Sequence, residues 1–354
     1  MAKRKFVQRA RSLEDAYDTS RGEHVVVEVE ISEEMRAEVL RQGTPLDASV
    51  GRDTKPASVD ELLSSLREGI AVAPGALVPF AGDPRVRAAL LEEARTCPPE
   101  RLANVAEAVA ALGGPQAVEV LRHWLHRLAE DPTTFEDASF FNWKAGSLTS
   151  VAGGLAALGT HTADALEALR RLLRHPCRAN RKTAAARLAD VTTSLAAEWQ
   201  KTALADLEAC YSSDDPAMFA CVAPAFVGSR EGAVFDRCEA LLSSEDSAVR
   251  ELAAVALQKM EHPRATSLLE QQLPRESSLR LAVRIAAQLG PKAWSASRIE
   301  IARRALADES PSLRLAGAAV LRTMQEPEAR SVAKAALADE PDAWIRSQLA
   351  ALSF

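Results

Sequence analysis

A short motif recurs in the C-terminal third of the chain and constrains the fold more than any other feature. Near the start of four predicted helices an arginine follows an apolar residue, at Arg250, Arg280, Arg314 and Arg346. Successive arginines are 30, 34 and 32 residues apart. Each interval holds two amphipathic helices, which is the signature of a helical solenoid whose units bury their apolar stripes by stacking. We therefore expect an all-α chain.

The same organisation continues toward the N-terminus with less regularity. Predicted helices end in an apolar residue followed by glycine at Leu112-Gly113, Leu158-Gly159, Val227-Gly228 and Leu289-Gly290. The next helix begins within a few residues each time, and such short connections make neighbouring helices antiparallel. Pairing helices backward from the C-terminus gives about eight antiparallel pairs. We predict an α-solenoid over residues 58–354, with an irregular cap at 58–97, divergent repeats at 98–230 and clear repeats at 231–354.

The first 57 residues differ from the rest. Residues 1–22 mix charges without apolar periodicity, which is typical of a flexible tail. Residues 24–31 are rich in valine and predict a single β-strand, and Ser32 can cap a short helix over 32–42. We interpret residues 1–57 as a flexible N-terminal extension.

The recurring motif resembles HEAT repeats. A turn acid followed by an apolar residue and arginine, as in Asp246…Val249-Arg250, is similar to the short, bacterial-type HEAT repeats first noted in phycobilisome lyases. The resemblance implies that the arginine-bearing helix lines the concave side and that turn acid and arginine hydrogen-bond between successive repeats. We therefore interpret the four arginines as a structural ladder. The resemblance weakens toward residue 98, since Phe219 replaces the arginine in one repeat, and Asp83–Arg87 looks like a second helix where counting requires a first.

Composition narrows the setting of the protein. Five cysteines are widely spaced without a C-x-x-C pair, which favours free thiols in a reducing cytoplasm over disulfides or a zinc site. No apolar run approaches the roughly 18 residues of a membrane-spanning helix. The basic start of the chain is not followed by the apolar segment of a secretory signal. We expect a cytoplasmic protein without membrane insertion.

A basic run is the first candidate binding site. Between residues 165 and 187 seven basic residues face one acidic residue, Glu167, which gives a local charge of +6 in a chain of −6. Such a run could bind phosphates or an acidic partner. Alternatively, it could complement a helix C-terminus and cover a solvated face. The seven residues are Arg170, Arg171, Arg174, Arg178, Arg181, Lys182 and Arg187.

An aromatic insertion at residues 131–144 is the second candidate. It holds four of the chain's aromatic residues, Phe135, Phe140, Phe141 and Trp143. Aromatic anchors on a loop are typical of interface hot spots, and they also serve to tuck a long loop onto its own protein. Both interpretations remain open at this level. We take Phe140, Phe141 and Trp143 as candidate partner-binding residues together with the basic run.

No catalytic constellation is visible in the sequence. His123 and His126 lie three residues apart on one predicted helix, but further zinc ligands are missing nearby. Phosphate-binding glycine loops and nucleophile-elbow motifs do not occur. We expect no enzyme activity, no cofactor and no metal.

Two functional hypotheses follow. The favoured one is a non-enzymatic scaffold or adaptor that binds a protein partner, an acidic one if it meets the basic run, on the concave face of a HEAT-like solenoid. The alternative is a nucleic-acid-binding protein similar in architecture to the HEAT-like alkylpurine DNA glycosylases. The catalytic acid of those proteins aligns with no residue here, and an isoelectric point near 5.7 disfavours this alternative. The oligomeric state is left open.

Overall fold

The computed structural model describes residues 58–60, 62, 80, 83–137, 142–289, 295–324 and 326–352. Every regular element within these ranges is a helix, which confirms the all-α prediction. The predicted strand at 24–31 and short helix at 32–42 lie outside the described residues.

The described residues form two compact units that divide between Ala225 and Phe226. Helix α13 crosses this division, contains Pro224 and leaves helical geometry at Arg230, where φ is −144° and ψ is 38°. Proline removes one helical hydrogen bond and clashes with the preceding turn, so it is a common cause of a kink. The division between the units follows Pro224 directly, and the non-helical residue Arg230 lies just inside the second unit.

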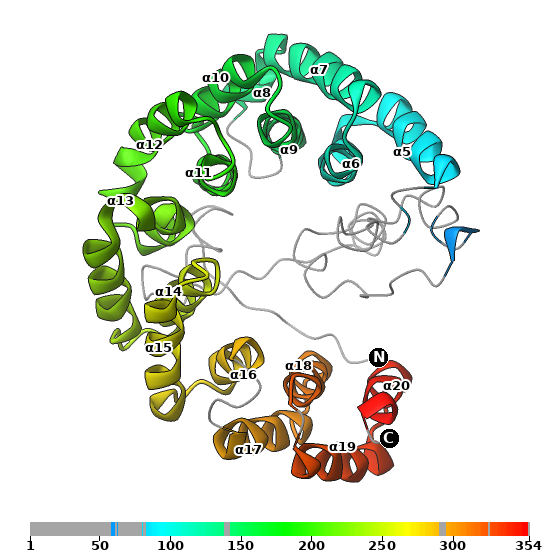
Figure 1. The fold of residues 1–354 in the computed structure, drawn as a ribbon, viewed down its shortest axis with the longest axis vertical. Helices are drawn as coiled ribbons and strands as arrows, with labels where there is room; N and C mark the ends of the chain where they lie inside the picture. The colour runs from blue at the N-terminus through cyan, green and yellow to red at the C-terminus, as the bar shows by residue number, and fades with distance from the viewer. Residues whose placement is uncertain are drawn as a thin grey trace, which may run out of the picture. The chain divides into compact units, whose positions relative to one another are not determined.

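The first unit contains two rows of helices (Figure 1). The outer row consists of α5 (Pro84–Thr96), α7 (Pro115–Glu130), α10 (Thr162–Leu172) and α12 (Ala197–Tyr211). The inner row consists of α6 (Pro99–Leu112), α9 (Trp143–Ala157), α11 (Arg178–Thr192) and the first part of α13 (Pro216–Leu242). The short helix α8 (Thr133–Glu136) lies in the connection between α7 and α9.

Helix α9 is the centre of the first unit and packs against α6, α7, α10 and α11. Its sequence is apolar on nearly every side because neighbouring helices cover nearly every side. Gly154 lets α9 approach α6 closely, since a Cβ there would lie 3.0 Å from the Cβ of Ala110.

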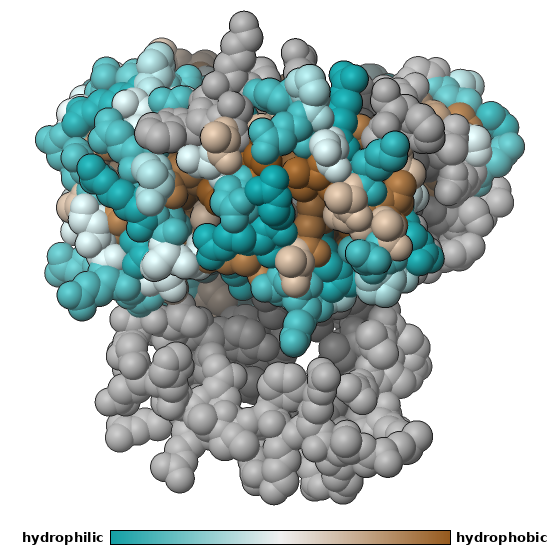
Figure 2. All heavy atoms as spheres, turned by 90° about the horizontal axis from the view of Figure 1, so that it is seen from below, coloured by the Kyte–Doolittle hydropathy of each residue, from teal (hydrophilic) through white to brown (hydrophobic). Residues whose placement is uncertain are grey.

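The second unit repeats the arrangement (Figure 1). After the second part of α13, its inner row consists of α14 (Ser247–Gln258), α16 (Leu279–Gln288), α18 (Pro311–Arg322) and α20 (Ala343–Leu352). The outer row consists of α15 (Pro263–Gln272), α17 (Ser295–Leu306) and α19 (Pro327–Asp339), and a 3-10 turn (Leu273–Arg275) follows α15. Hydrophilic side chains cover most of the described surface in Figure 2, with hydrophobic ones showing between them.

Outer and inner helices alternate along the described chain. The pairs are α5–α6, α7–α9, α10–α11, α12 with the first part of α13, the second part of α13 with α14, α15–α16, α17–α18 and α19–α20. The prediction of about eight antiparallel pairs is confirmed for this part of the chain. Residues 84–96 form an outer helix, which is the first of its pair. The count of helices was therefore a better guide than the sequence of Asp83–Arg87, which resembles the start of a second helix.

A fully buried arginine joins helix ends in the second unit. Arg298 of α17 is 0% exposed, and its Nε donates to the carbonyl of Ala286, at the end of α16, over 2.9 Å. Its Nη2 donates to the hydroxyl of Thr323, at the end of α18. Burial lowers the pKa of Arg298 from its usual high value. The guanidinium thus satisfies acceptors at two helix C-termini, where carbonyls lack helical partners.

Candidate functional site

The basic run forms the end of α10, the following turn and most of α11. Its side chains point in several directions. Arg170 reaches α12, where its Nε donates to Asp206 Oδ1 over 2.9 Å. Arg171 reaches back to α7, where its Nη1 donates to the carbonyl of Ala129 over 3.2 Å. The structure therefore does not gather the seven basic residues on one face.

Carboxylates, most of them from outside the run, offset much of the local charge. Besides Asp206, Arg170 bonds Glu167 over 2.7 Å, and its pKa is raised chiefly by the hydrogen bond to Asp206. Arg178 pairs with Asp215 over 2.6 Å, and Arg187 with Glu107 of α6 over 3.6 Å. Four carboxylates thus face the seven basic side chains, whereas the sequence showed one. The other three are distant in sequence, so counting charges along the run missed them.

Two of the basic residues have no such engagement. Arg174, at the end of α10, is exposed, and Lys182 of α11 is partly exposed. Neither side chain makes a hydrogen bond or ion pair with any residue that the structure describes. These two cations are the part of the basic run that is available to a partner.

The beginning of the aromatic insertion lies against the basic run. The guanidinium of Arg171 stands 3.6 Å from the ring centre of Phe135, a cation–π contact. Lys144 Nζ donates to Asp131 Oδ2 over 2.6 Å, and hydrogen bonds from Lys144 and Thr133 lower the pKa of Asp131 to about 2. The basic run and the aromatic insertion are thus neighbours in space. Side-chain contacts hold the described part of the insertion in place.

Asn142 fixes the other end of the insertion. Its Oδ1 accepts from the backbone N–H of Ala145 and caps α9. Its Nδ2 donates to the carbonyls of Thr133, Thr134 and Asp137 over 3.1, 3.3 and 3.2 Å. One buried amide therefore closes the loop on itself.

His175, between α10 and α11, contacts the same loop through Asn142. It is 1% exposed, its Nδ1 accepts from the backbone N–H of Cys177 over 3.0 Å, and its Nε2 lies 3.3 Å from Asn142 Nδ2. Burial lowers the pKa of His175 below 6.5, so the ring is neutral at neutral pH. Sequence analysis passed over His175, because a single histidine in a turn carries no pattern.

The remaining predicted residues of the insertion are described only in part. Phe140 and Phe141 lie outside the described residues, and Trp143 begins α9 with a partly exposed side chain. Their role as partner contacts stays a prediction.

Arg181 belongs to the repeat ladder. Its Nη1 donates to the carbonyls of His175 and Pro176, six and five residues earlier, over 2.7 Å each. Arg250 makes the same pair of bonds to Ser244 and Glu245, over 2.9 Å each. Arg181 thus stabilises its own turn, and sequence analysis had placed it with the binding residues.

The ladder bonds also join successive repeats. Arg250 donates Nε and Nη2 to the turn acid Glu276 of the next repeat over 2.9 and 2.6 Å. Arg314 bonds Glu340 in the same way, with Nε–Oε2 at 3.0 Å. Arg346 makes the bond within its own turn, to the carbonyl of Glu340 over 3.0 Å. These three arginines occupy the fourth position after the residue that precedes the helix.

Arg280 lies outside this ladder. Helix α16 is capped by Ser278, so the fourth position is the buried Ala282 and Arg280 comes two positions too early. Its side chain is 74% exposed, and among the described residues its one charged partner is Glu251, at 3.6 Å. Aligning Arg280 with the ladder was therefore incorrect, because the cap residue sets the register of the helix.

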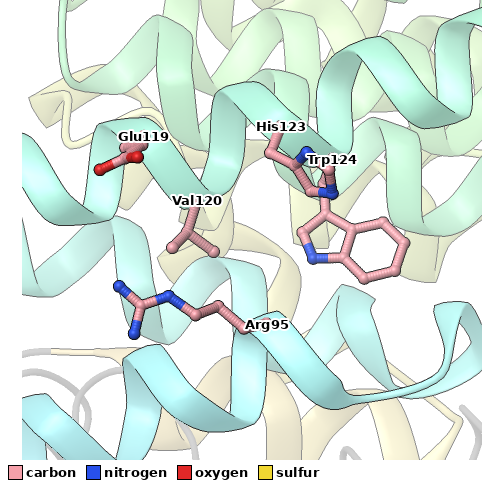
Figure 3. A pocket seen from close by; sticks show the side chains of 5 residues that line it. All are labelled: Arg95, Glu119, Val120, His123 and Trp124. Atoms are coloured by element: carbon pink, nitrogen blue, oxygen red, sulfur yellow. The ribbon is translucent and has the colours of Figure 1, made fainter.

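A shallow cleft of about 220 Å³ lies between the outer helices α5 and α7. Arg95 lines one side, across from Glu119, Val120, His123 and Trp124 (Figure 3). Trp124 is 2% exposed, and its Nε1 donates to the carbonyl of Ala94 over 2.6 Å. The tryptophan is therefore used in packing, and the polar side chains that line the cleft are Arg95, Glu119 and His123.

The described residues contain no group of three or more side chains that could hold a metal ion. His123 and His126 are both exposed on α7. No helix in this part of the chain combines the length and the apolar character needed to cross a bilayer.

Comparisons with known proteins found likenesses among solved structures. No family model matches the chain, and no curated protein matches it. The complex of CpcE and CpcF of phycocyanin lyase from Nostoc sp. PCC7120 is similar with a TM-score of 0.38 and 16% identity, over 74% of this chain and 94% of that chain. Human deoxyhypusine hydroxylase in complex with glycerol is similar with a TM-score of 0.31 and 16% identity, over 79% of this chain and 98% of that chain.

These findings correct one expectation. We expected a chain that is not an enzyme, yet the two similar structures are of a lyase and a hydroxylase. The expectation of a non-enzymatic chain is therefore withdrawn, and no reaction is assigned in its place. The particular type of HEAT-like repeat also stays a prediction.

Proposed function

We propose that the chain is a helical-repeat protein that binds an acidic protein partner through its first unit. The contact surface consists of Phe135, Arg171, Arg174 and Lys182, and we call it the basic–aromatic surface. The observation that carries the proposal is the pair of available cations, Arg174 and Lys182, in the same basic run as Arg171, which contacts Phe135, and His175, which contacts Asn142.

Pre-organisation supports this assignment. A loop that is already ordered loses little conformational entropy on binding, so more of the contact energy appears as affinity. Asn142 and His175 supply that order here. Arginine and aromatic side chains are also enriched among the residues that dominate binding energy at protein interfaces. Phe140, Phe141 and Trp143, of the same insertion, stay predicted partner contacts.

The charges favour a protein over a nucleic acid. Nucleic-acid affinity grows with the number of phosphates that a basic face neutralises. Three of the seven basic residues, Arg170, Arg178 and Arg187, are paired with carboxylates instead. Two free cations suffice for an acidic patch on a protein and fall short of a phosphate track. Nucleic-acid binding is the alternative that the experiment must separate.

A matched pair of double variants tests the proposal. R174E/K182E reverses the two available cations. The control R330E/K334E makes the same charge change on the exposed side of α19, in the other unit. The full-length protein and both variants are used for affinity capture after cross-linking in the cells of origin, with and without nuclease and at low and high salt. Circular dichroism checks that each variant is folded.

We expect one stoichiometric acidic protein with the wild type and the control, and about tenfold less of it with R174E/K182E, as reversing two interfacial charges predicts. Equal recovery by the two double variants would remove the basic–aromatic surface from the proposal. Recovery of nucleic acid that nuclease or high salt abolishes would favour the alternative function.

A further inference from the structure

Helix α16 departs from the other arginine-bearing inner helices of the second unit. In α14 and α18 the ladder arginine is buried and bonds the preceding turn. In α16 that position is Ala282, and the arginines are instead Arg280 and Arg284. These two are four residues apart and therefore lie on one face of the helix.

The two arginines share a single counter-charge. Arg280 Nε and Arg284 Nη1 each lie 3.6 Å from Oε1 of Glu251, on the neighbouring inner helix α14. Their side chains are 74% and 42% exposed, while Glu251 is 25% exposed. Neither guanidinium makes a hydrogen bond to any residue that the structure describes. The two guanidinium groups therefore keep donors that face solvent, and together with Glu251 they carry a net charge of +1.

Helix stability does not account for this placement. Arg280 is the second residue of α16, where the positive end of the helix dipole disfavours a cation. Like charges four residues apart on a helix also repel each other. An arrangement that is unfavourable within the helix, exposed and weakly paired is the kind that an interaction with a negatively charged partner compensates.

Partly buried apolar residues continue the same surface. Val255 is one turn beyond Glu251 on α14, Ala287 is close to one turn beyond Arg284 on α16, and both are partly exposed. The helices α14 and α16 contact each other in the inner row (Figure 1). On each of these two helices a small apolar residue thus follows the charged residues by about one turn.

We propose that this α14–α16 surface, formed by Glu251, Val255, Arg280, Arg284 and Ala287, binds an acidic segment of a partner polypeptide. The segment would carry two carboxylates about 6 Å apart, the spacing of side chains four residues apart on a helix. Each guanidinium can grip one carboxylate through two parallel hydrogen bonds. The assignment is independent of the basic–aromatic surface, because the residues belong to the other unit.

Fluorescence anisotropy with the full-length protein tests this assignment. The probe is a labelled alanine-based peptide of about 15 residues with pairs of glutamates four residues apart, and its partner probe has glutamine at those positions. We expect R280E/R284E to bind the glutamate probe at least tenfold more weakly than the wild type. The matched control R330E/K334E stays within about twofold of the wild type, because its charges lie on an outer helix.

A change of opposite sign sharpens the test. E251Q removes the shared counter-charge, so both guanidiniums become available and the glutamate probe binds about threefold more tightly. R280K/R284K keeps the charges and loses the bidentate geometry, and its affinity falls between those of the wild type and R280E/R284E. Circular dichroism confirms that each variant is helical before binding is measured.

Several results would overturn the assignment. One is equal affinity for the glutamate and glutamine probes, and another is unchanged affinity in R280E/R284E. Preference for a duplex DNA probe at the same salt concentration would assign the surface to nucleic acid instead. A peptide of residues 23–38, which carries six glutamates, is a third probe. If it bound this surface far more tightly than the glutamate probe, the occupant would be the chain's own segment. If R174E/K182E captured as much partner as the wild type, the basic–aromatic surface would be refuted and this assignment would not be affected. The two proposals can therefore be refuted separately.

Discussion

Replacing Arg250 with alanine tests the repeat ladder at its best-defined bond. Arg250 donates four hydrogen bonds, two to Glu276 and two to the carbonyls of Ser244 and Glu245. The side chains of Arg250 and Glu276 are 10% and 0% exposed. Removing one partner of a buried pair leaves the other charge uncompensated, which typically costs about 3–5 kcal/mol. We expect R250A to lose stability on that scale.

Arg280→Ala is the matched control. The side chain is 74% exposed, and its one charged contact within the described part of the chain, with Glu251, is at 3.6 Å. Exposed ion pairs contribute about 0–1 kcal/mol, so we expect R280A to change the free energy of unfolding by no more than about 0.5 kcal/mol. Urea denaturation followed by circular dichroism, with hydrogen exchange of the α14 and α16 amides, measures both variants. Equal losses in R250A and R280A would refute the distinction between ladder and non-ladder arginines.

The pH dependence of R250A follows from Glu276. Burial opposes ionisation of this carboxyl, but hydrogen bonds from Arg250, Ser278 and Gln272 outweigh it and hold its pKa below 4.5. The pair therefore contributes its stability above pH 4.5, the ordinary value, and loses it as the pH falls through the lower folded pKa. In R250A the bonds from Arg250 no longer offset the burial of the Glu276 carboxylate. The loss of unfolding free energy relative to the wild type is therefore largest near neutral pH and becomes smaller in acid. A stability deficit that stays constant from pH 7 to well below 4.5 would contradict this account.

Three further predictions concern buried groups. Burial lowers the pKa of His175, so its neutral form stabilises the loop above pH 6.5 and this support is lost as the pH falls through the lower folded pKa. The hydrogen-exchange protection factors of residues 131–137, corrected for the slower intrinsic exchange in acid, should fall over this range, and H175Q should abolish that fall. A Cβ at Gly153 would lie 2.1 Å from Nε of Arg187, so G153A should cost about 1–3 kcal/mol in denaturant titrations, and R187A should rescue much of the loss; an additive double variant would disprove the contact. Burial raises the pKa of Cys238 to about 12, so a thiol reagent should modify Cys238 only after unfolding, as mass spectrometry of the native protein would show; rapid native labelling would contradict its burial.

Local patterns predicted the fold because a repeat is a local pattern. Helix starts, glycine ends and the recurring arginine all depend on residues within one or two turns, and they gave the correct all-α architecture and number of pairs. The same reasoning failed at Arg280. An apolar residue followed by arginine marks the ladder only when the cap lies four residues before the arginine, and Ser278 lies two before it.

The candidate site was less predictable than the fold. Four pairs of groups decide which cations are available: Arg170 with Asp206, Arg178 with Asp215, Arg187 with Glu107, and Arg171 with Phe135. The partners in each pair are 36 to 80 residues apart in the sequence. No local spacing rule connects residues at such separations, so the net charge of the run was overestimated.

The sequence by itself determined that this chain forms paired, antiparallel helices, since amphipathic periodicity and capping residues act within single helices. It also identified where positive charge and aromatic side chains concentrate. Only the tertiary structure decided which of those side chains are engaged in ion pairs and which are accessible. Stacking brings distant carboxylates to Arg170, Arg178 and Arg187, while Arg174, Lys182, Arg280 and Arg284 remain accessible. The physical reason is that an ion pair depends on distance in space, which the packing of helices sets and the order of residues does not.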